Sequence, residues 1–436
     1  MTALQSNSTV HSTADDAVAR AVAEAREAQL RWGSLSVRER LKRLAQLRHR
    51  VAASATELAD AITSPQRTHA EMLASEVIPL ADAIHFLERN ATRILRPRRY
   101  GRRGRPLWLG ATHLQVHREP FGVVLIVSPS NYPLLLAGVQ AVQALAAGNA
   151  VLVKPAPGHA APVRRLQSLL DVEPGLFAVL PEDVAAVDAA VRAGVDKVVF
   201  TGSAENGAAV LSNLAPHLIP AAMELSGHDA VFVCADADLD LVARCVAYGL
   251  ALNGGATCIA PRRIFVPRAM AATLEQRLSA LVNFGSGVGT AAVSIVPVAS
   301  AEQALALDAE CPYALGASIF GSRDAAAFMA ARVNAGCVVI NDMIVPTADP
   351  RLPFGGRGRS GFGVTRGAEG LLEMTRVKAI TTRTGSFRPH LDASHPLDAD
   401  LFRHYLAAAH GGTINARVRG AVGLVRTLIR RGRQSS

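Results

Sequence analysis

The sequence predicts an α/β fold built on two parallel sheets. From Phe121 onward, short β-branched runs such as GVVLIVSP and AVLVKP alternate with helical patterns. These runs are apolar at every position rather than at alternate positions, which is typical of strands buried on both faces of a sheet. A second series of the same kind begins near Ala230. Because 436 residues are enough for two or three domains, we expect the second series to form its own lobe.

The segments on either side of these series carry other patterns. In roughly the first ninety residues, apolar residues recur at spacings of three and four, as in DDAVARAVAEAREAQLRW, and predict a layer of amphipathic helices. The stretch LWLGATHLQVHREP, residues 107–120, alternates around a glycine and predicts a β-hairpin. From about residue 385 the chain becomes polar and ends in a basic helix.

The composition excludes several classes of protein. Half of the residues are hydrophobic and 19% are charged, which is usual for a folded globular chain. Much of the net charge of +10 lies in residues 93–106 and in the last twenty residues. The two segments contain a single aromatic residue, Tyr100, and neither forms a DNA-reading motif, so we expect no nucleic-acid partner. No uncharged apolar stretch is long enough to cross a bilayer.

The cysteines indicate a reducing compartment. There are five, they are scattered, and none forms a CxxC pair. The N-terminal MTALQSNSTV is polar and lacks the pattern of a signal peptide. We therefore expect a cytoplasmic protein without disulfides and without a metal site.

The C-terminal helix has an apolar stripe surrounded by arginines. Ile414, Val418, Val422, Val425 and Ile429 fall on one face. Such a pattern is typical of a helix that binds a partner or lies on a membrane surface. Docking on its own subunit is the more common role of such a stripe, and peripheral attachment to a membrane is the alternative.

Polar groups follow several of the predicted strands, where ligands of parallel sheets bind. Gly202, Ser203 and Gly207 follow the strand KVVFT and open a helix, whose N–H groups could hold a pyrophosphate. A plain tight turn explains this pattern equally well. Lys154 ends the strand AVLVK and could contact a ribose or a phosphate, although a solvated surface lysine is an equally good interpretation.

Two further residues have side chains suited to catalysis. Glu224 ends the apolar run LIPAAMEL, where partial burial would raise the carboxyl pKa toward that of a general base. The alternative is a carboxylate that caps a helix. Cys258 follows the small residues NGGAT, whereas Cys234, Cys245 and Cys337 lie within apolar runs. Because buried free cysteines are usually inert, the local sequence alone favours a packing role for Cys258.

A series of motifs changes that preference. The motifs are REPFGVVLIVSPSNYP, ALAAGNAVLVKPA, KVVFTGSAENG, MELSG, NGGATCIAPRRIFV, CPYALGASIF and LPFGGRGRSGFG followed by EGLLEMTRVKAI. In their order and spacing, they resemble the NAD(P)-dependent aldehyde dehydrogenase superfamily over residues 118–382. The resemblance implies a Rossmann-type parallel sheet domain plus a second, shortened α/β catalytic domain.

The resemblance also assigns roles to individual residues. Cys258 matches the nucleophile, whose thiohemiacetal and thioester carry an aldehyde to a carboxylate. Asn131 matches the amide that, with the backbone N–H of Cys258, stabilises the oxyanion. Glu224 matches the general base that activates water or helps deprotonate the cysteine. Lys154 and the turn Gly202–Gly207, which includes Ser203, match the dinucleotide contacts.

The sequence departs from the family pattern after the nucleophile. Only Ile259–Glu310 separates Cys258 from CPYALGASIF, where family members have a longer run. That run contains an acidic-Ile-Phe-Gly-Pro motif whose Glu contacts the nicotinamide ribose, but NFGSGVGTAAVSIVPV has no Glu. Pro157 stands where NAD-selective relatives often have a Glu that repels a 2′-phosphate. We therefore expect NAD or NADP as coenzyme.

The resemblance divides the chain into regions and implies partners. The partners are a small-molecule aldehyde, whose identity the sequence does not specify, and further copies of the chain in a homodimer or homotetramer. The regions are residues 1–225 with the N-terminal helices, the hairpin and the dinucleotide-binding domain, 226–345 with the shortened catalytic domain, 346–384 as a return segment, and 385–436 as a tail with a basic amphipathic helix.

Two other functions stay open at this point. A CoA-acylating dehydrogenase would pass the acyl group to a thiol instead of water, and Glu224 argues against it because relatives of that type generally lack this base. A nucleotide-binding protein or scaffold that has lost turnover is the second alternative. The retention of Cys258, Glu224 and Asn131 together argues against that loss.

Overall fold

The structure is a computed structural model that describes residues 4–282, 292–386 and 388–434. The chain divides into two compact units. The large unit comprises residues 1–98 and 115–380, and the small unit comprises residues 99–114 and 381–436. All of the candidate catalytic and coenzyme-binding residues belong to the large unit.

The first sheet of the large unit has six strands in the order β15-β7-β6-β3-β4-β5. Five run parallel to one another, and β15 pairs antiparallel with β7. Every residue of β3 and β4 is buried, which explains the absence of polar alternation in these runs. The strands are β3 (Val123–Val127), β4 (Ala150–Lys154), β5 (Phe177–Val179), β6 (Lys197–Gly202), β7 (Ala221–Leu225) and β15 (Gly361–Phe362).

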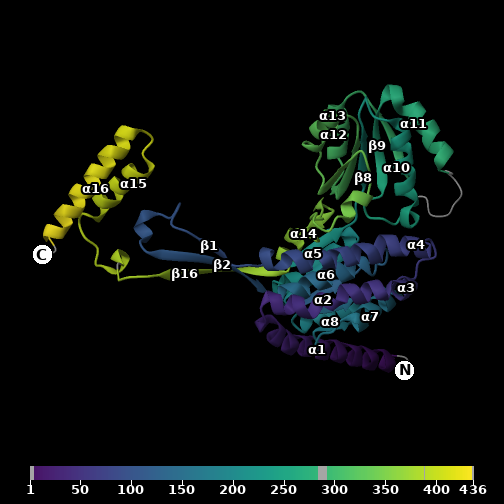
Figure 1. Cartoon of the computed structure of the whole chain (residues 1–436), viewed down its shortest axis with the longest axis horizontal. Helices are drawn as coiled ribbons and strands as arrows, with labels where there is room; N and C mark the ends of the chain where they lie inside the picture. The colour runs from purple at the N-terminus through teal and green to yellow at the C-terminus, as the bar shows by residue number, and fades with distance from the viewer. Residues whose placement is uncertain (1–3, 283–291, 387, 435–436) are drawn as a thin grey trace. The chain divides into compact units, whose positions relative to one another are not determined.

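Helices from two parts of the chain share one hydrophobic core with this sheet. Figure 1 shows α1 and α2 of the N-terminal segment together with α6, α7 and α8 from the sheet crossovers. The layer of N-terminal helices predicted from the sequence is confirmed. The helices are α1 (Leu4–Ser34), α2 (Val37–Ala53), α3 (Ala55–Asp60), α4 (His69–Met72), α5 (Ile78–Ile94), α6 (Leu135–Ala147), α7 (Ala160–Leu169), α8 (Ala185–Arg192) and α9 (Ala204–Leu214).

Helix α6 begins at a buried ion pair. Glu76 lies in a π-helical turn, Leu73–Val77, and accepts hydrogen bonds from the backbone N–H groups of Leu134 (2.8 Å) and Leu135 (3.1 Å). Its carboxylate also lies 2.7 Å from the guanidinium of Arg67, and both side chains are almost fully buried. The carboxylate therefore satisfies N–H groups that the first turn of a helix leaves without partners.

The other end of α6 is fixed by side chains from α1 and α2. The indole Nε1 of Trp32 donates to the carbonyl oxygen of Leu145 at 2.8 Å, and Trp32 is fully buried. The Nε of Arg40 donates to the carbonyl oxygen of Ala146 at 3.1 Å. Since the last carbonyls of a helix lack partners within the helix, these contacts anchor α6 in the N-terminal layer.

The second sheet has five parallel strands in the order β10-β9-β8-β12-β13. Val231 and Val233 of β8 pack in a core with α10 and α11, while Ala230 and Phe232 face a core with α12 and α13. Figure 1 shows the two helix pairs on opposite sides of this sheet. The elements are β8 (Asp229–Val233), α10 (Leu239–Ala251), β9 (Pro261–Pro267), α11 (Arg268–Leu281), β10 (Ser294–Val298), α12 (Ala301–Ala309), β12 (Gly316–Phe320), α13 (Arg323–Ala330) and β13 (Cys337–Ile340).

The segment after β13 leads from the second sheet back to the first. A two-residue strand, β14 (Arg357–Gly358), pairs with β11 (Tyr313–Ala314), and β15 then joins the edge of the first sheet. Phe354 bridges to Thr365, and α14 (Gly367–Glu373) follows. This path brings Thr365 close to the end of β7, where Glu224 lies.

The hairpin predicted for residues 107–120 is corrected by the structure. Residues 107–109 form a 3₁₀ turn, and β2 (Thr112–Pro120) lies between β1 (Arg98–Tyr100) and β16 (Thr375–Arg383) in a three-stranded sheet. Lys378 and Glu119, which are 259 residues apart, pair at 2.9 Å. Local alternation indicates a strand but does not identify a partner this distant in the chain.

The small unit contains two packed helices, α15 (Asp398–His410) and α16 (Ile414–Gln434). The sequence predicted the basic helix α16 but gave no indication of α15. Among the helices of the described residues, none combines the length and the apolar character needed to cross a bilayer.

Candidate active site

Cys258 follows a reversal of the chain at the end of α10. Asn253, Gly254 and Gly255 have successive positive φ angles of 53°, 59° and 77°. Glycine adopts this backbone conformation without a Cβ clash, and asparagine tolerates it better than most residues do. The run NGGAT is therefore required by the backbone of this reversal, and its small side chains also leave space beside the thiol.

Hydrogen bonds tie the segment carrying Asn131 to the Cys258 loop. The Nδ2 of Asn131 donates to the carbonyl oxygen of Ala256 at 2.8 Å, and the Nδ2 of Asn253 donates to the carbonyl oxygen of Asn131 at 2.9 Å. The hydroxyls of Tyr132 and Thr257 lie 2.6 Å apart. These bonds use one amide hydrogen of Asn131, so its second amide hydrogen is available to a ligand.

Glu224 lies near the end of β7 with only 4% of its surface exposed. Its Oε2 accepts a hydrogen bond from Thr365 Oγ1 at 3.0 Å. Among the residues that the structure describes, none donates to Oε1. Burial raises the pKa of this carboxyl, while Arg366 and the bond from Thr365 oppose the rise. A buried carboxyl with one unpaired oxygen and a raised pKa is suited to accept a proton from water.

The Cys258 thiol is partly buried and close to two acidic side chains. Burial raises its pKa to about 12, with further contributions from Glu224 and Asp229. Arg366 and the backbone N–H of Ile259 oppose this shift. With this raised pKa, the Cys258 thiol is neutral at physiological pH. Nucleophilic attack requires its proton to move to a base, because the thiolate is the reactive form.

Arg366 supplies a fixed positive charge beside these acidic groups. Its Nη1 donates to the carbonyl oxygen of Thr347 at 2.9 Å, and its guanidinium lies 4.5 Å from the centre of the Phe354 ring. The charge lowers the pKa of both Glu224 and Cys258 relative to what burial alone would produce. Neither Thr365 nor Arg366 was singled out from the sequence.

Two cavities meet at Cys258, and Glu224 and Thr257 also line both of them. The first, which we name the polar cavity, has a volume of about 350 Å³. The second, the apolar cavity, has a volume of about 510 Å³. The lining of the polar cavity includes Asn131, Thr201, Gly202, Ser226 and Arg262. The lining of the apolar cavity includes Tyr132, Leu135, Leu136, Tyr248, Leu252 and Phe354.

Arg262 brings an unsatisfied donor to the polar cavity. Its Nη2 donates to the carbonyl oxygen of Gly255 at 2.9 Å, whereas its Nη1 is buried and finds no acceptor among the described residues. Burial lowers the pKa of this guanidinium. Because an unpaired buried donor is costly, the position favours a ligand with an oxygen acceptor. Arg262 was not singled out from the sequence, although the double arginine in CIAPRRIFV follows Cys258 closely.

The glycines of the βα turn are needed for close packing. A Cβ atom at Gly202 would lie 2.7 Å from the Phe200 ring, and one at Gly207 would lie 2.6 Å from Leu225. Ser203 caps α9 by accepting a hydrogen bond from the N–H of Asn206 at 3.2 Å. The turn thus brings the start of α9 close to the strand ends, and Gly202 lines the polar cavity with Cys258.

Lys154 ends β4 and has only 4% of its surface exposed, so it is not a solvated surface lysine. Burial lowers its pKa, and Asp183 and Glu182 oppose the shift. Lys154, Ser203 and Gly207 do not line the polar cavity. The structure therefore brings Cys258, Glu224, Asn131 and Gly202 together around one space and leaves these three residues away from it.

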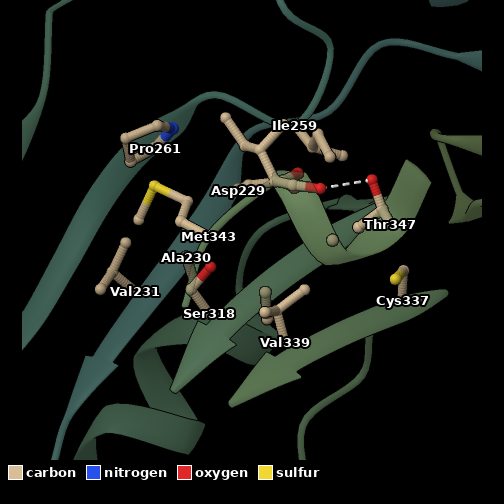
Figure 2. Close-up of a pocket in the computed structure, with 13 residues that line it drawn as sticks. Asp229, Ala230, Val231, Ile259, Pro261, Ser318, Cys337, Val339, Met343 and Thr347 are labelled. Carbon is tan, nitrogen blue, oxygen red and sulfur yellow. Dashed lines mark hydrogen bonds between the residues drawn. The ribbon is translucent and has the colours of Figure 1, made fainter. Parts of the chain in front are cut away.

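A third, small cavity lies beneath the Cys258 loop at Asp229. Figure 2 shows Asp229 near Ile259, with Cys337 on β13, which β12 separates from the strand of Asp229. Burial raises the pKa of Asp229 well above its usual range, while a hydrogen bond from the backbone N–H of Gly316 opposes the shift. The cavity has a volume of about 10 Å³, which is at most the space of one water molecule. Ile259, the residue after Cys258, is part of its lining, and the cavity is too small for a substrate.

The ribose-binding Glu of family members is expected within residues 283–298, of which 283–291 lie outside the described residues. That the coenzyme site lacks this Glu therefore stays a prediction from the sequence. Within the described ranges, no group of three or more His, Cys, Asp or Glu side chains is arranged to hold a metal ion.

The fold agrees with the comparison to known families. The model of the aldehyde dehydrogenase family matches residues 4–287 and 290–380. The chain belongs to this family. It is 30% identical over 432 residues to the 4,4′-diapolycopene aldehyde oxidase of Methylomonas sp, and the match covers 83% of this chain and 81% of that protein.

Solved structures of aldehyde dehydrogenases share the fold. A Mycobacterium tuberculosis aldehyde dehydrogenase complexed with NAD+ has a TM-score of 0.79 at 21% identity, covering 86% of this chain and 92% of that one. The NADP-dependent glyceraldehyde-3-phosphate dehydrogenase of Bacillus halodurans C-125, complexed with NADP, has a TM-score of 0.77 at 24% identity, covering 85% and 91%. The fold class predicted from the sequence is confirmed.

Proposed function

We propose that this aldehyde dehydrogenase oxidises an aldehyde to a carboxylate, with NAD or NADP as the oxidant, through a thioester on Cys258. The observation that carries the proposal is the meeting of two cavities of different character at one thiol. Hydride transfer requires the reacting carbon of the aldehyde and the nicotinamide ring of the coenzyme to approach each other closely. Cys258 and Glu224 are accessible from both cavities, so they can act on a group held between them.

The first step joins Cys258 to the substrate. The Sγ atom bonds to the aldehyde carbon, the thiol proton passes to a base, and the carbonyl oxygen becomes a thiohemiacetal oxyanion. In this scheme the base is a water molecule of the cavity, because the charge of Glu224 raises the thiol pKa and Glu224 acts in the later hydrolysis. Asn131 lines the polar cavity, and its second amide hydrogen would donate to the oxyanion.

The second stage releases the acid. When bound, the nicotinamide coenzyme accepts the hydride whose departure leaves a thioester. The Oε1 of Glu224 holds a water molecule and takes its proton as the water oxygen attacks the thioester carbon. The carbon–sulfur bond then breaks, the carboxylic acid leaves, and Cys258 regains its electron pair and subsequently a proton.

Several residues of this chain fit a dinucleotide. Arg262 offers its unpaired Nη1 to an oxygen acceptor in the polar cavity. Gly202, Ser203 and Gly207 bring the N-terminus of α9 close to the strand ends, where the helix dipole favours a pyrophosphate. Lys154 would contact a ribose or a phosphate of the dinucleotide, as the family resemblance implies. Relatives of similar fold bind NAD+ in one case and NADP in another, which supports either coenzyme.

The apolar cavity favours an aldehyde with a hydrocarbon body. Aliphatic and aromatic side chains dominate its lining, and burial of apolar surface there gives about 25 cal/mol per Å². The charge of Arg366 is already shared among the Thr347 carbonyl, the Phe354 ring and Glu224. An anionic substrate would have to compete for this charge. The name of one relative, a diapolycopene aldehyde oxidase, is consistent with an apolar aldehyde.

The experiment is a rate comparison over an aldehyde panel with each coenzyme. We expect reduced coenzyme and a carboxylic acid in equal amounts, with higher kcat/KM for long alkyl or polyene aldehydes than for succinate semialdehyde or glyceraldehyde 3-phosphate. Product yield that depended on added CoA would show acyl transfer to a thiol instead. A Cys258→Ala variant as active as the wild type would rule out the proposed route.

We also propose that the active form is a homodimer or homotetramer, because the family resemblance implies one. The mass of the protein in solution, measured by light scattering after gel filtration, tests this point. A monomeric mass at the concentrations used for the activity assay would contradict it.

A further inference from the structure

The net charge of the chain is concentrated in its small unit. Residues 99–114 and 381–436 contain thirteen arginines and three aspartates, without any lysine or glutamate. Their balance of +10 equals the net charge of the whole chain, so the large unit is formally neutral. The large unit therefore provides no net charge that would attract a polyanionic surface, and the small unit carries the whole net charge.

Helix α16 combines this charge with an exposed apolar face. The helix contains six arginines and no acidic residue. Six of its large apolar side chains are 44–80% exposed, although hydrophobic residues with this exposure rarely gather on one helix face without a partner. We name this set the α16 stripe: Ile414, Val418, Val422, Val425, Leu428 and Ile429.

The opposite face of α16 packs on α15. A Cβ atom at Gly420 would lie 2.3 Å from the backbone nitrogen of Ala408, and one at Gly423 would lie 2.3 Å from the His404 ring. These two glycines therefore mark the side that touches α15. At 100° per residue, that side is turned well away from the α16 stripe. The stripe is not the surface through which the two helices pack.

Arginines border the stripe along its length. Arg419, Arg426, Arg430 and Arg433 recur at spacings of seven, four and three, so they fall along one side of the helix. An aliphatic stripe bordered by arginines, in a helix with a strongly basic polar face, is the arrangement of helices that lie in the interface of a membrane. The arginines would meet the headgroups while the aliphatic side chains enter the outer acyl region.

We propose that the small unit docks through α16 on a lipid surface that is rich in anionic headgroups. The charge of the unit is complementary to such a surface, and the α16 stripe supplies apolar area that a nucleic acid has no matching surface to bury. Pairing of two copies through α16 would bring two arginine-bordered faces together, which like-charge repulsion opposes. The docking is peripheral, and it does not depend on the chemistry at Cys258.

Sedimentation of the full-length protein with vesicles tests the proposal. We expect it to sediment with vesicles of phosphatidylcholine and phosphatidylglycerol at low salt and to stay in solution with pure phosphatidylcholine. High salt should weaken the binding, since it screens exposed charges. Equal binding to both kinds of vesicle, or no binding to either, would overturn the proposal.

Charge variants separate the arginines from the net charge. Because each arginine near an anionic surface contributes about 1 kcal/mol, or roughly fivefold in affinity, a triple Arg419→Gln, Arg426→Gln, Arg430→Gln variant should bind about 100-fold more weakly. The matched control loses the same charge from the large unit and should bind as the wild type does. The control replaces three exposed arginines with glutamine: Arg20, Arg268 and Arg323.

Stripe variants test the apolar part of the docking. Val418→Gln with Val425→Gln keeps every charge and should reduce vesicle binding at least tenfold. Val184→Gln with Val377→Gln removes similarly exposed valines from the large unit and should leave the binding unchanged. Circular dichroism and the dehydrogenase rate in solution should match the wild type for all four variants, which confirms that they fold.

Two other outcomes would identify a different binding partner for α16. If the stripe variants lost self-association measured by light scattering but kept vesicle binding, the stripe would be an interface between copies of the chain. If the protein bound duplex DNA more tightly than anionic vesicles, and the stripe variants bound the DNA as well as the wild type, the arginines would serve a nucleic acid. Either result would overturn the assignment of α16 to a lipid surface.

Discussion

The polar and apolar cavities share Cys258 but are built from different parts of the chain. The polar cavity is formed mainly by residues at the carboxyl ends of β3, β6 and β7 and by the loop that contains Cys258. The apolar cavity is formed by side chains of α6, α10 and the helices around residue 74, together with the return segment after β13. The proposed catalytic groups thus depend on the backbone of the sheet, whereas the wall of the apolar cavity depends on helices and loops packed around it.

The difference between the cavities explains which features were visible in the sequence. Strand ends carry a strong local signal, because a fully apolar run stops at a polar residue such as Glu224 or Lys154. The wall of the apolar cavity comes from helices whose residues look like ordinary core positions. Its composition became apparent only when the structure placed those residues around the thiol.

The largest expected effect concerns the buried Arg67–Glu76 ion pair at the start of α6, a helix that lines the apolar cavity. Glu76→Gln removes the partner of the buried Arg67 and weakens the bonds at the start of α6, so the free energy of unfolding should fall by about 3–5 kcal/mol. The control Glu88→Gln disrupts a more exposed ion pair with Arg48 and should cost less than about 1 kcal/mol. Urea denaturation measures both. Equal losses would show that the buried pair has no special role.

The next effect concerns the polar side of the thiol. Asn131→Ala removes the proposed oxyanion donor and should lower kcat by about 10²–10³, the usual cost of losing one such donor. The dissociation constant of the coenzyme should change little, because the amide acts on the reacting oxygen. The neighbouring Ser130→Ala serves as control. A change in coenzyme binding without a change in kcat would show that Asn131 binds the coenzyme and does not act on the oxyanion.

A pair of substitutions separates the functions of the two cavities. Arg262→Gln removes a charged donor and should weaken coenzyme binding by about 10- to 100-fold, as expected for a lost hydrogen bond of a charged group. Val345→Gln changes an exposed position on the apolar cavity and should lower kcat/KM for long-chain aldehydes about fivefold, roughly 1 kcal/mol of apolar burial. Fluorescence titration and steady-state rates measure the two effects. If both variants changed both quantities alike, the cavities would not be separate sites.

The smallest expected effect is electrostatic. With the pKa of Cys258 raised to about 12, the thiolate fraction of the free enzyme should rise with pH throughout the range from 7 to 10, without a plateau. The rate of alkylation by iodoacetamide should follow that fraction. Because the Glu224 carboxylate raises this pKa, Glu224→Gln should lower it and accelerate alkylation severalfold at fixed pH. The exposed Glu205→Gln is the control, and slower alkylation of Glu224→Gln would instead identify Glu224 as the base for the thiol.

The sequence predicted the two parallel sheets because their strands are apolar throughout, and it predicted the residues at strand ends because polarity changes there. It did not predict Thr365 and Arg366, which reach the end of β7 from a segment about 140 residues later. No local pattern marks such a contact. The hairpin at 107–120 failed for the same reason, since the partner of β2 comes from β16 near the end of the large unit.

Identification of the covalent intermediate tests the central claim most directly. Glu224→Gln, mixed with an aldehyde and coenzyme and quenched in acid, should accumulate an acyl group on the peptide that contains Cys258, because hydrolysis is slowed while the thioester still forms. Peptide mass spectrometry reads the position of the adduct among the five cysteines. The account predicts the acyl mass on Cys258 alone. Turnover with an adduct on another cysteine, or full turnover by Cys258→Ala, would contradict it.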